Sequence, residues 1–345
     1  MTGLESGGLI AKLFRMRRVV SLVSCIALAG AAAILTSGCT TTANSGSVDE
    51  AVFDSQSDYI VETVVRGQML RLKVDPGAPW YVLLNGSAAK RLGLVGTRGA
   101  TFAVGPMRVK GKTRSEKITF GTIEASRPVI WFKGESVRGA DGVVNPANIP
   151  HDRVTLRFGA PSDAERIIEL PMRFDQERGL YHELSFGGQI ILTRFTLQDE
   201  LTTATGAAAS VIAKRRNGFW EGDIFTYPVR YGIVRPVRKM VLGEPLSVNG
   251  LPLSKLAVRV SDDRGSYYLP EKQVPDPEIE DEGDDGVVVT GKRGRIYGAP
   301  HFWLMIGRDS LIRCSSISYE IRSKKLRLSC ALSAQKAGLL KGDAG

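Results

Sequence analysis

RLKVDPGAPWYVLL, residues 71–84, joins two apolar, β-type segments through an aspartate, a proline and a glycine. Upstream, residues 59–74 alternate apolar and polar side chains about a central Arg-Gly pair, which predicts a β-hairpin. Downstream, NGSAAKRLGL, residues 85–94, predicts a short helix that ends at Gly93. Asp75 is therefore expected in the turn that follows a buried strand.

Short, glycine-punctuated strands follow, among them EKITFGTI and RPVIWFKG, and the same order of elements recurs later in the chain. AAKRLG and IAKRRNG occupy matching places in the two halves, as do GVVNPANI and LMIGRDSL. The pattern predicts an all-β protein with minor short helices, built from two divergent copies of one β unit. A length of 345 residues, with 43% hydrophobic and 24% charged residues, fits a soluble globular protein of two domains.

The amino terminus has the layout of a secretory signal, because four cations precede an apolar run at residues 19–35. LTSGC, residues 35–39, resembles a bacterial lipobox, which implies that Cys39 is lipidated and becomes the new amino terminus. Thr40 follows where an inner-membrane lipoprotein would carry aspartate, so the resemblance implies an outer-membrane anchor facing the periplasm. Soluble periplasmic or secreted protein is the alternative, and the start codon is Met1 or Met16.

Export decides how the cysteines and the charge are interpreted. Cys25 would leave with the signal and Cys39 would be lipidated, which leaves Cys314 and Cys330 in an oxidising compartment. We expect a disulfide between them, with two buried thiols as the alternative. The formal net charge of +10 would normally suggest nucleic acid as a partner, but an exported protein rarely meets nucleic acid. An anionic lipid or glycan surface, or plain solvation of the basic side chains, is expected instead.

Changes in composition predict the domain boundaries. The expected segments are a signal peptide at 1–38, a flexible tether at 39–58, lobe 1 at 59–160, an inter-lobe connector at 161–190, lobe 2 at 191–333 with an acidic insertion at 271–294, and a tail at 334–345.

LKVDPGAPWYVLLNGSAAKRLGL resembles the bacterial retropepsin-like aspartic peptidases, in which an apolar strand precedes Asp-Thr/Ser-Gly-Ala and an Ala-rich helix follows. The resemblance covers most of residues 59–330. With the duplication, it implies two retropepsin-like β-barrel lobes in one chain, a pepsin-like bilobal architecture. It also implies that Asp75 is the first catalytic carboxylate, on the active-site loop of Pro76, Gly77 and Ala78, and that Asp-Gly-Val-Val at residues 141–144 backs this loop.

Aspartic peptidases need two carboxylates, one from each lobe, close enough to share a proton. Lobe 2 offers two registers: counting back from the shared AKR puts Asp199 opposite Asp75, whereas strand phase puts Gln198 there. Pro76 lacks the hydroxyl that the family has at this position, and Asn145 replaces an expected glycine. The sequence thus predicts a diverged site of weak or absent activity, with an active Asp75–Asp199 dyad as one alternative and a non-catalytic partner-binding protein as another.

Other chemistries have little support in the sequence. It has no G-x-S-x-G, no H-E-x-x-H and no cysteine pair at metal-ligand spacing, so we expect neither a metal nor another cofactor. His151, His182 and His301 lie far apart and are expected to be packing or surface residues. The expected partners are a peptide or protein in the inter-lobe cleft and a membrane reached through the lipid anchor, with no nucleic acid. Residues 286–293, GVVVTGKR, resemble a segment of TonB-dependent receptors, which implies that they could add a strand to a partner's sheet. A solvated loop with one local strand is the alternative.

Overall fold

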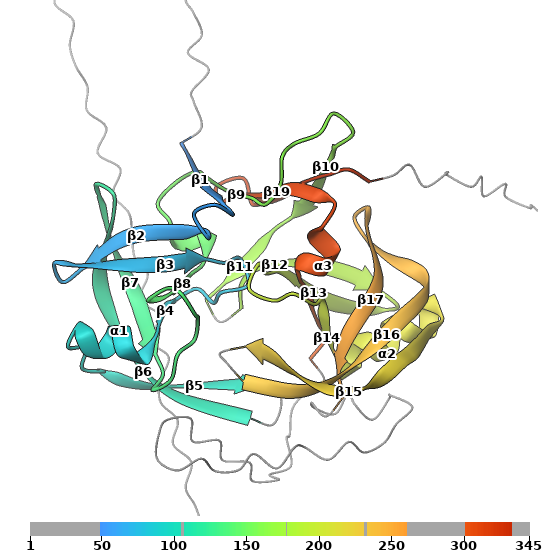
Figure 1. Cartoon of the computed structure of the whole chain (residues 1–345), viewed down its shortest axis with the longest axis horizontal. Coiled ribbons are helices and arrows are strands. Elements are labelled where there is room, and N and C mark those ends of the chain that lie inside the picture. Colours follow the sequence, from blue (N-terminus) through green and yellow to red (C-terminus); the bar gives the residue numbers. More distant parts are fainter. Residues whose placement is uncertain (1–48, 105–106, 177, 231–232, 261–300, 333–345) are drawn as a thin grey trace, which may run out of the picture. The chain divides into compact units, whose positions relative to one another are not determined.

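The computed structural model describes residues 49–104, 107–176, 178–230, 233–260 and 301–332. Four of the predicted features lie outside the described residues: the signal peptide with Cys39, the acidic insertion at 271–294, the segment at 286–293 that resembles TonB-dependent receptors, and the tail at 334–345. In the described part, strands predominate and helices are short (Figure 1). The predicted fold class, all-β with minor short helices, is confirmed.

Lobe 1 is built on one sheet whose spatial order is β2-β3-β8-β4-β7-β6-β5, and a further pairing of β2 with β6 closes six of these strands into a barrel. Its strands are β2 (Ile60–Val65), β3 (Gln68–Val74), β4 (Val82–Leu84), β5 (Arg98–Val104), β6 (Met107–Phe120), β7 (Ile123–Trp131) and β8 (Gly142–Val144). In β3, Leu70, Leu72 and Val74 are buried at every second position, which is the pattern of a strand with one face on the core.

Lobe 2 repeats this order. Its sheet runs β11-β12-β13-β18-β14-β17-β16-β15, so β12 to β18 follow the sequence of neighbours seen from β2 to β8, with β11 added at the edge. Its strands are β11 (Arg173–Asp175), β12 (Gly179–Phe186), β13 (Gln189–Phe195), β14 (Thr203–Thr205), β15 (Gly218–Arg230), β16 (Ile233–Val248), β17 (Leu251–Arg259) and β18 (Trp303–Ile306). The predicted duplication is therefore present in the strand order itself. The sheet of lobe 2 already includes β11 and β12, which lie within the expected connector at 161–190.

The helices also occupy corresponding places in the two lobes. Helix α1 (Gly86–Arg91) follows β4, and α2 (Gly206–Arg216) follows β14; the 3₁₀ helix η1 (Pro146–Asn148) follows β8, and α3 (Arg308–Leu311) follows β18. Thr205 caps α2 through its hydroxyl, and the helix ends at Asn217 in the left-handed conformation. Lobe 2 therefore has the longer of the two equivalent helices.

A third sheet, of order β1-β9-β19-β20-β10, draws strands from both halves of the chain. Its members are β1 (Glu50–Asp54), β9 (Arg153–Arg157), β10 (Arg166–Pro171), β19 (Cys314–Glu320) and β20 (Lys325–Cys330). The expected tether at 39–58 is therefore wrong for residues 50–54, which pair in parallel with β9. Ala51 and Phe53 are partly buried and pack on the core, whereas Glu50, Val52 and Asp54 are exposed. This alternation in burial is concealed in the sequence, because Val52 on the exposed face is also apolar.

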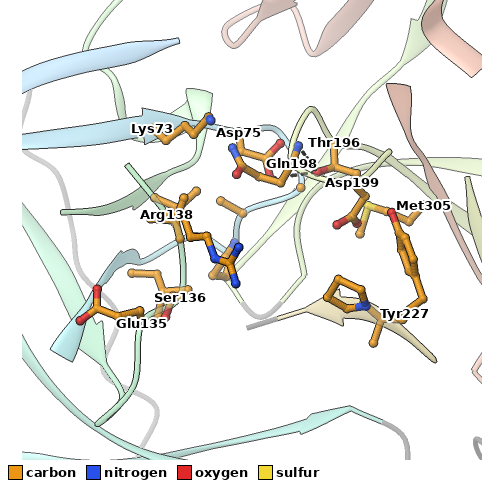
Figure 2. A pocket seen from close by; sticks show the side chains of 18 of the residues that line it. Lys73, Asp75, Glu135, Ser136, Arg138, Thr196, Gln198, Asp199, Tyr227 and Met305 are labelled. Carbon is orange, nitrogen blue, oxygen red and sulfur yellow. Dashed lines mark hydrogen bonds between the residues drawn. The ribbon is translucent and has the colours of Figure 1, made fainter. Parts of the chain in front are cut away.

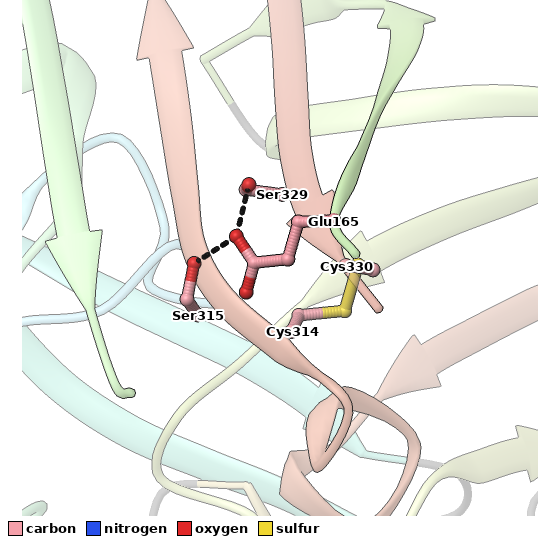
Figure 3. Close-up of a disulfide and its surroundings, with 5 residues drawn as sticks. All are labelled: Glu165, Cys314, Ser315, Ser329 and Cys330. Atoms are coloured by element: carbon pink, nitrogen blue, oxygen red, sulfur yellow. Dashed lines mark hydrogen bonds between the residues drawn. A yellow bond between two sulfur atoms is a disulfide. The ribbon is translucent and has the colours of Figure 1, made fainter. Parts of the chain in front are cut away.

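The predicted disulfide between Cys314 and Cys330 joins β19 to β20 and is confirmed (Figure 3). Beside it, the Glu165 carboxylate accepts hydrogen bonds from the hydroxyls of Ser315, at 2.8 Å, and Ser329, at 2.6 Å. A cross-link over 16 residues stabilises a fold by about 3 kcal/mol, by restricting the unfolded chain. The sheet shared by both lobes is thus reinforced at its last hairpin.

Candidate functional site

Asp75 lies where β3 ends, in the turn predicted from the sequence. Its N–H donates to the Val144 carbonyl at 3.0 Å, and its own carbonyl accepts from the N–H of Ala78 at 3.0 Å, which closes a four-residue turn. Proline is favoured at the second position of such a turn, where its fixed φ fits and no N–H is required. Pro76 is therefore compatible with the turn that follows β3, and Asp75 is held there with 4% of its surface exposed.

Asn145 supports this loop from behind. Its side-chain amide donates to the carbonyls of Pro76, at 3.1 Å, and Ala78, at 2.7 Å, while its oxygen accepts from the N–H of Ala147 at 3.0 Å. Asn145 is fully buried, so these bonds are shielded from water. Asn145, which stands where the resemblance expects a glycine, thus supports the loop of Pro76 and Ala78 from within lobe 1.

The position in lobe 2 that corresponds to Asp75 is occupied by Thr196. In lobe 1, Val74 of β3 pairs with Val144 of β8, and the next residue, Asp75, donates its N–H to Val144. In lobe 2, Phe195 of β13 pairs with Ile306 of β18, and the next residue, Thr196, donates its N–H to Ile306 at 3.0 Å. The two registers expected from the sequence, Asp199 and Gln198, are therefore both wrong as structural counterparts of Asp75.

The Asp75 and Thr196 loops meet directly (Figure 2). The Thr196 hydroxyl donates to Oδ2 of Asp75 at 3.2 Å, and the N–H of Leu197 donates to Oδ1 at 2.9 Å. Gly77 permits this approach, because a Cβ on Gly77 would lie 2.9 Å from the Cβ of Thr196. Both carboxylate oxygens of Asp75 thus accept hydrogen bonds from lobe 2, and the partner group at the centre is a hydroxyl.

Asp75 is also close to the sheet shared by the lobes. Tyr319 of β19 is fully buried, which raises the pKa of its hydroxyl well above the usual value, and the negative charge of Asp75 raises that pKa further. A phenol with a raised pKa stays protonated and neutral. The surroundings of Asp75 on this side therefore carry no second negative charge from Tyr319.

Asp199 lies three residues beyond Thr196 and lines the same cavity as Asp75. Its backbone carbonyl accepts from the N–H of Arg308 at 3.1 Å, which ties this segment to the start of α3. Burial raises the pKa of Tyr227, and the negative charge of Asp199 adds to that shift. Figure 2 shows Asp199 on the side of the cavity that carries Tyr227 and Met305.

The cavity lies between the lobes and has a volume of about 760 Å³. The charged side chains that line it are Lys73, Asp75, Glu135, Arg138 and Asp199, and its apolar lining includes Leu83, Val143, Val229, Val234 and Met305. One buried apolar cluster contains Leu83 of β4, Val104 and Val109 of the β5–β6 hairpin, and Val229 and Ile233 of the β15–β16 hairpin. The lobes therefore contact each other along two sides of the cavity: at the Asp75 and Thr196 loops, and at these hairpins.

The described residues contain no group of three His, Cys, Asp or Glu side chains that could hold a metal ion. His182 is buried in β12 with Nδ1 at 2.9 Å from the Pro171 carbonyl, and burial lowers its pKa. His151 contacts Asp49 at 2.9 Å. Neither histidine lines the inter-lobe cavity.

Comparison with known proteins adds a likeness in fold. No family model matches the sequence, and no curated protein matches it. Among solved structures, a crystal structure of an aspartic proteinase from Irpex lacteus is similar, with 13% sequence identity and a TM-score of 0.38, over 79% of this chain and 94% of that chain. A likeness this distant assigns no role to any residue, so the roles below depend on the geometry of this chain alone.

Proposed function

We propose that this chain is an aspartic-peptidase-like, exported protein that binds a ligand between its lobes and does not cleave peptides. The observation that carries the proposal is Thr196 at the position that corresponds to Asp75. Peptide hydrolysis by this architecture needs two carboxylates that share one proton, one acting as base on water and the other as acid. A threonine hydroxyl, which does not ionise at accessible pH, cannot act as the second carboxylate.

Asp75 then has a structural role in the proposal. It accepts two hydrogen bonds from lobe 2, and bonds to an ionised group contribute about 1.5–3 kcal/mol each. The residue that would activate water in a peptidase instead fastens the two lobes together at the floor of the cavity. The alternative, an active enzyme that pairs Asp75 with Asp199, is favoured by one observation: both residues line the same cavity.

The first prediction concerns catalysis. Between pH 3 and pH 7, the wild-type protein should degrade a denatured protein substrate no faster than Asp75→Asn does, because Thr196 cannot take part in proton sharing. The measurement is the appearance of new amino termini over time. Cleavage at acid pH that is abolished by Asp75→Asn would contradict the proposal, and its loss in Asp199→Asn as well would identify Asp199 as the partner carboxylate.

Export to an oxidising compartment is supported by the Cys314–Cys330 disulfide. Within the described residues, no helix is long and apolar enough to cross a membrane. We include in the proposal that Cys39 carries a lipid that anchors the protein at the outer membrane facing the periplasm, on the lipobox resemblance of residues 35–39.

The second prediction tests this anchor. Cys39→Ala should move the protein from the membrane fraction into the soluble fraction, because a lipid chain supplies the binding energy that holds such a protein to a bilayer. Cys25→Ala is the matched control, since this cysteine lies within the apolar part of the signal, and it should leave the protein in the membrane fraction. Fractionation followed by immunoblotting gives the answer. Equal membrane retention of both variants would refute lipidation at Cys39.

A further inference from the structure

A clamped loop forms the lobe 1 wall of the cavity. This loop runs from the end of β7 to the start of β8, and the Asn85 side chain holds it. Asn85 accepts from the N–H groups of Ser136, at 2.7 Å, and Val137, at 3.1 Å, and donates to the carbonyls of Val137 and Ala140, both at 2.8 Å. With 2% of its surface exposed, Asn85 makes four shielded bonds, so the loop is rigidly positioned.

Arg138 lies on this clamped loop and lines the cavity, and its side chain is exposed. Figure 2 shows its guanidinium directed into the cavity, whereas the Glu135 carboxylate points away from it. In the part of the chain that the structure describes, no acidic side chain lies within ion-pair distance of Arg138. A guanidinium presented by a fixed backbone is preorganised to bind an anion that enters from solvent.

Three of the other charged groups of the cavity, those of Lys73, Glu135 and Asp75, are engaged elsewhere. Lys73 pairs with Asp58 at 2.7 Å, so it is partly neutralised. Glu135 accepts from the N–H of Ser87 at 3.3 Å, which draws its carboxylate toward the start of α1. Asp75 accepts from lobe 2 through both oxygens. Arg138 is therefore the cation that remains available to a ligand.

The wall around Arg138 is apolar. Val143 lies on the same lobe, and Val229, Val234 and Met305 line the cavity from lobe 2. An apolar surface of this kind gains free energy by covering the hydrocarbon part of a ligand, at about 25 cal/mol for each Å² removed from water. A ligand that binds both to Arg138 and to the apolar wall thus has one anionic group and an apolar body.

We propose that the inter-lobe cavity binds an apolar ligand through a single carboxylate held by Arg138. This inference extends the proposed function by naming the chemical class of its ligand. A planar carboxylate matches the two parallel N–H donors of one guanidinium. Asp75 and Asp199 in the same cavity would repel a phosphate, with up to two negative charges, more strongly than they repel a singly charged carboxylate. A peptide carboxy-terminus with apolar last residues and a fatty carboxylate both fit this description.

Three probes separate these sources: acetyl-Ala-Val-Leu with a free carboxylate, the same peptide as its amide, and octanoate. Their affinities for the full chain are measured by titration calorimetry. Wild-type protein should bind the free acid at least tenfold more tightly than the amide. Arg138→Gln should abolish this preference, and its melting temperature should stay unchanged because the side chain is exposed. Arg98→Gln, an exposed arginine of β5 outside the cavity, should retain the preference.

Each outcome of these titrations either supports or overturns the inference that Arg138 binds a carboxylate. Binding of octanoate that depends on Arg138, without binding of either peptide, supports the inference with a fatty carboxylate as ligand. The inference is overturned by any of three results: equal affinity for the acid and the amide, a preference for the acid that survives Arg138→Gln, or no binding of any probe. Cleavage of a protein substrate would overturn only the proposed lack of peptidase activity. The role of Arg138 could then still be tested, by measuring whether the Michaelis constant of the active enzyme depends on Arg138.

Discussion

Gly86→Ala should lower the melting temperature of the protein by about 6–12 °C, which corresponds to a loss of about 3 kcal/mol in the free energy of unfolding. Helix propensity predicts the opposite sign, since alanine is favoured over glycine by up to about 1 kcal/mol in a helix. At Gly86, the steric effect of the added Cβ outweighs helix propensity and determines the sign of the change in stability. A Cβ on Gly86 would overlap the backbone carbonyl of Lys133, which cannot rotate away as the end of a side chain could.

The same substitution should weaken the cavity wall. Gly86 donates its N–H to the carbonyl of Gly134 at 3.1 Å, so moving α1 away from Lys133 also displaces the loop that carries Arg138. Gly99→Ala in β5 is the matched control, because nothing lies within 4 Å of a Cβ built there, and its melting temperature should change by less than 2 °C. Thermal unfolding followed by circular dichroism compares the two. An unchanged melting temperature in Gly86→Ala would show that α1 can shift without cost.

The order of elements within each lobe could be predicted from the sequence, because the elements on which that prediction rests have local signals. Local pattern and counting predict the alternating burial in β3, the alanine-rich helices α1 and α2, and the pairing of Cys314 with Cys330. The strand β1 could not be predicted in this way. Its five residues have a weak alternation, and the partner that orders them, β9, lies about a hundred residues away.

The counterpart of Asp75 was predicted wrongly because neither guide to register, the shared AKR motif or the strand phase, reports which residues pair in the sheet. Counting back from the shared AKR assumes helices of equal length, but α2 has 11 residues and α1 has 6, so the motif at Ala213–Arg215 lies about one turn too far along. Strand phase repeats every two residues, so a slip of two from Thr196 to Gln198 keeps every side chain on its proper face. Backbone pairing with β18, which no local pattern encodes, determines the register.

The role of Asn145 was hidden for a different reason. A comparison of motifs scores asparagine in place of glycine, and proline in place of threonine, as two separate losses. In three dimensions the two substitutions lie together, since the Asn145 amide binds the Pro76 carbonyl. This bond joins residues 69 positions apart in the sequence, and it becomes visible once the β3–β8 pairing is known.

Thr196→Asp should make the stability of the protein strongly dependent on pH. The Thr196 hydroxyl lies 3.2 Å from Oδ2 of Asp75, so the new carboxylate would lie against an existing one in a buried site. Two carboxylates this close cannot both ionise without a large cost, and one of them takes a pKa raised above its unfolded value of about 3.9. Each unit of that shift corresponds to about 1.4 kcal/mol.

The sign follows from the raised pKa. Below about pH 3.9 the added carboxyl is protonated in both the folded and the unfolded states, so it costs no ionisation energy. As the pH rises through the raised pKa, the unfolded state releases its proton more readily than the folded state, and stability falls. We therefore expect Thr196→Asp to lose at least about 2 kcal/mol relative to wild type between pH 4 and pH 7. Thr196→Asn, which has a similar size and no charge, should show no such slope. Urea unfolding at pH 4 and pH 7 measures the free energy of unfolding of each variant. Parallel pH profiles for the two variants would mean that residue 196 does not face Asp75. The assignment of Thr196 as the counterpart of Asp75 would then be wrong.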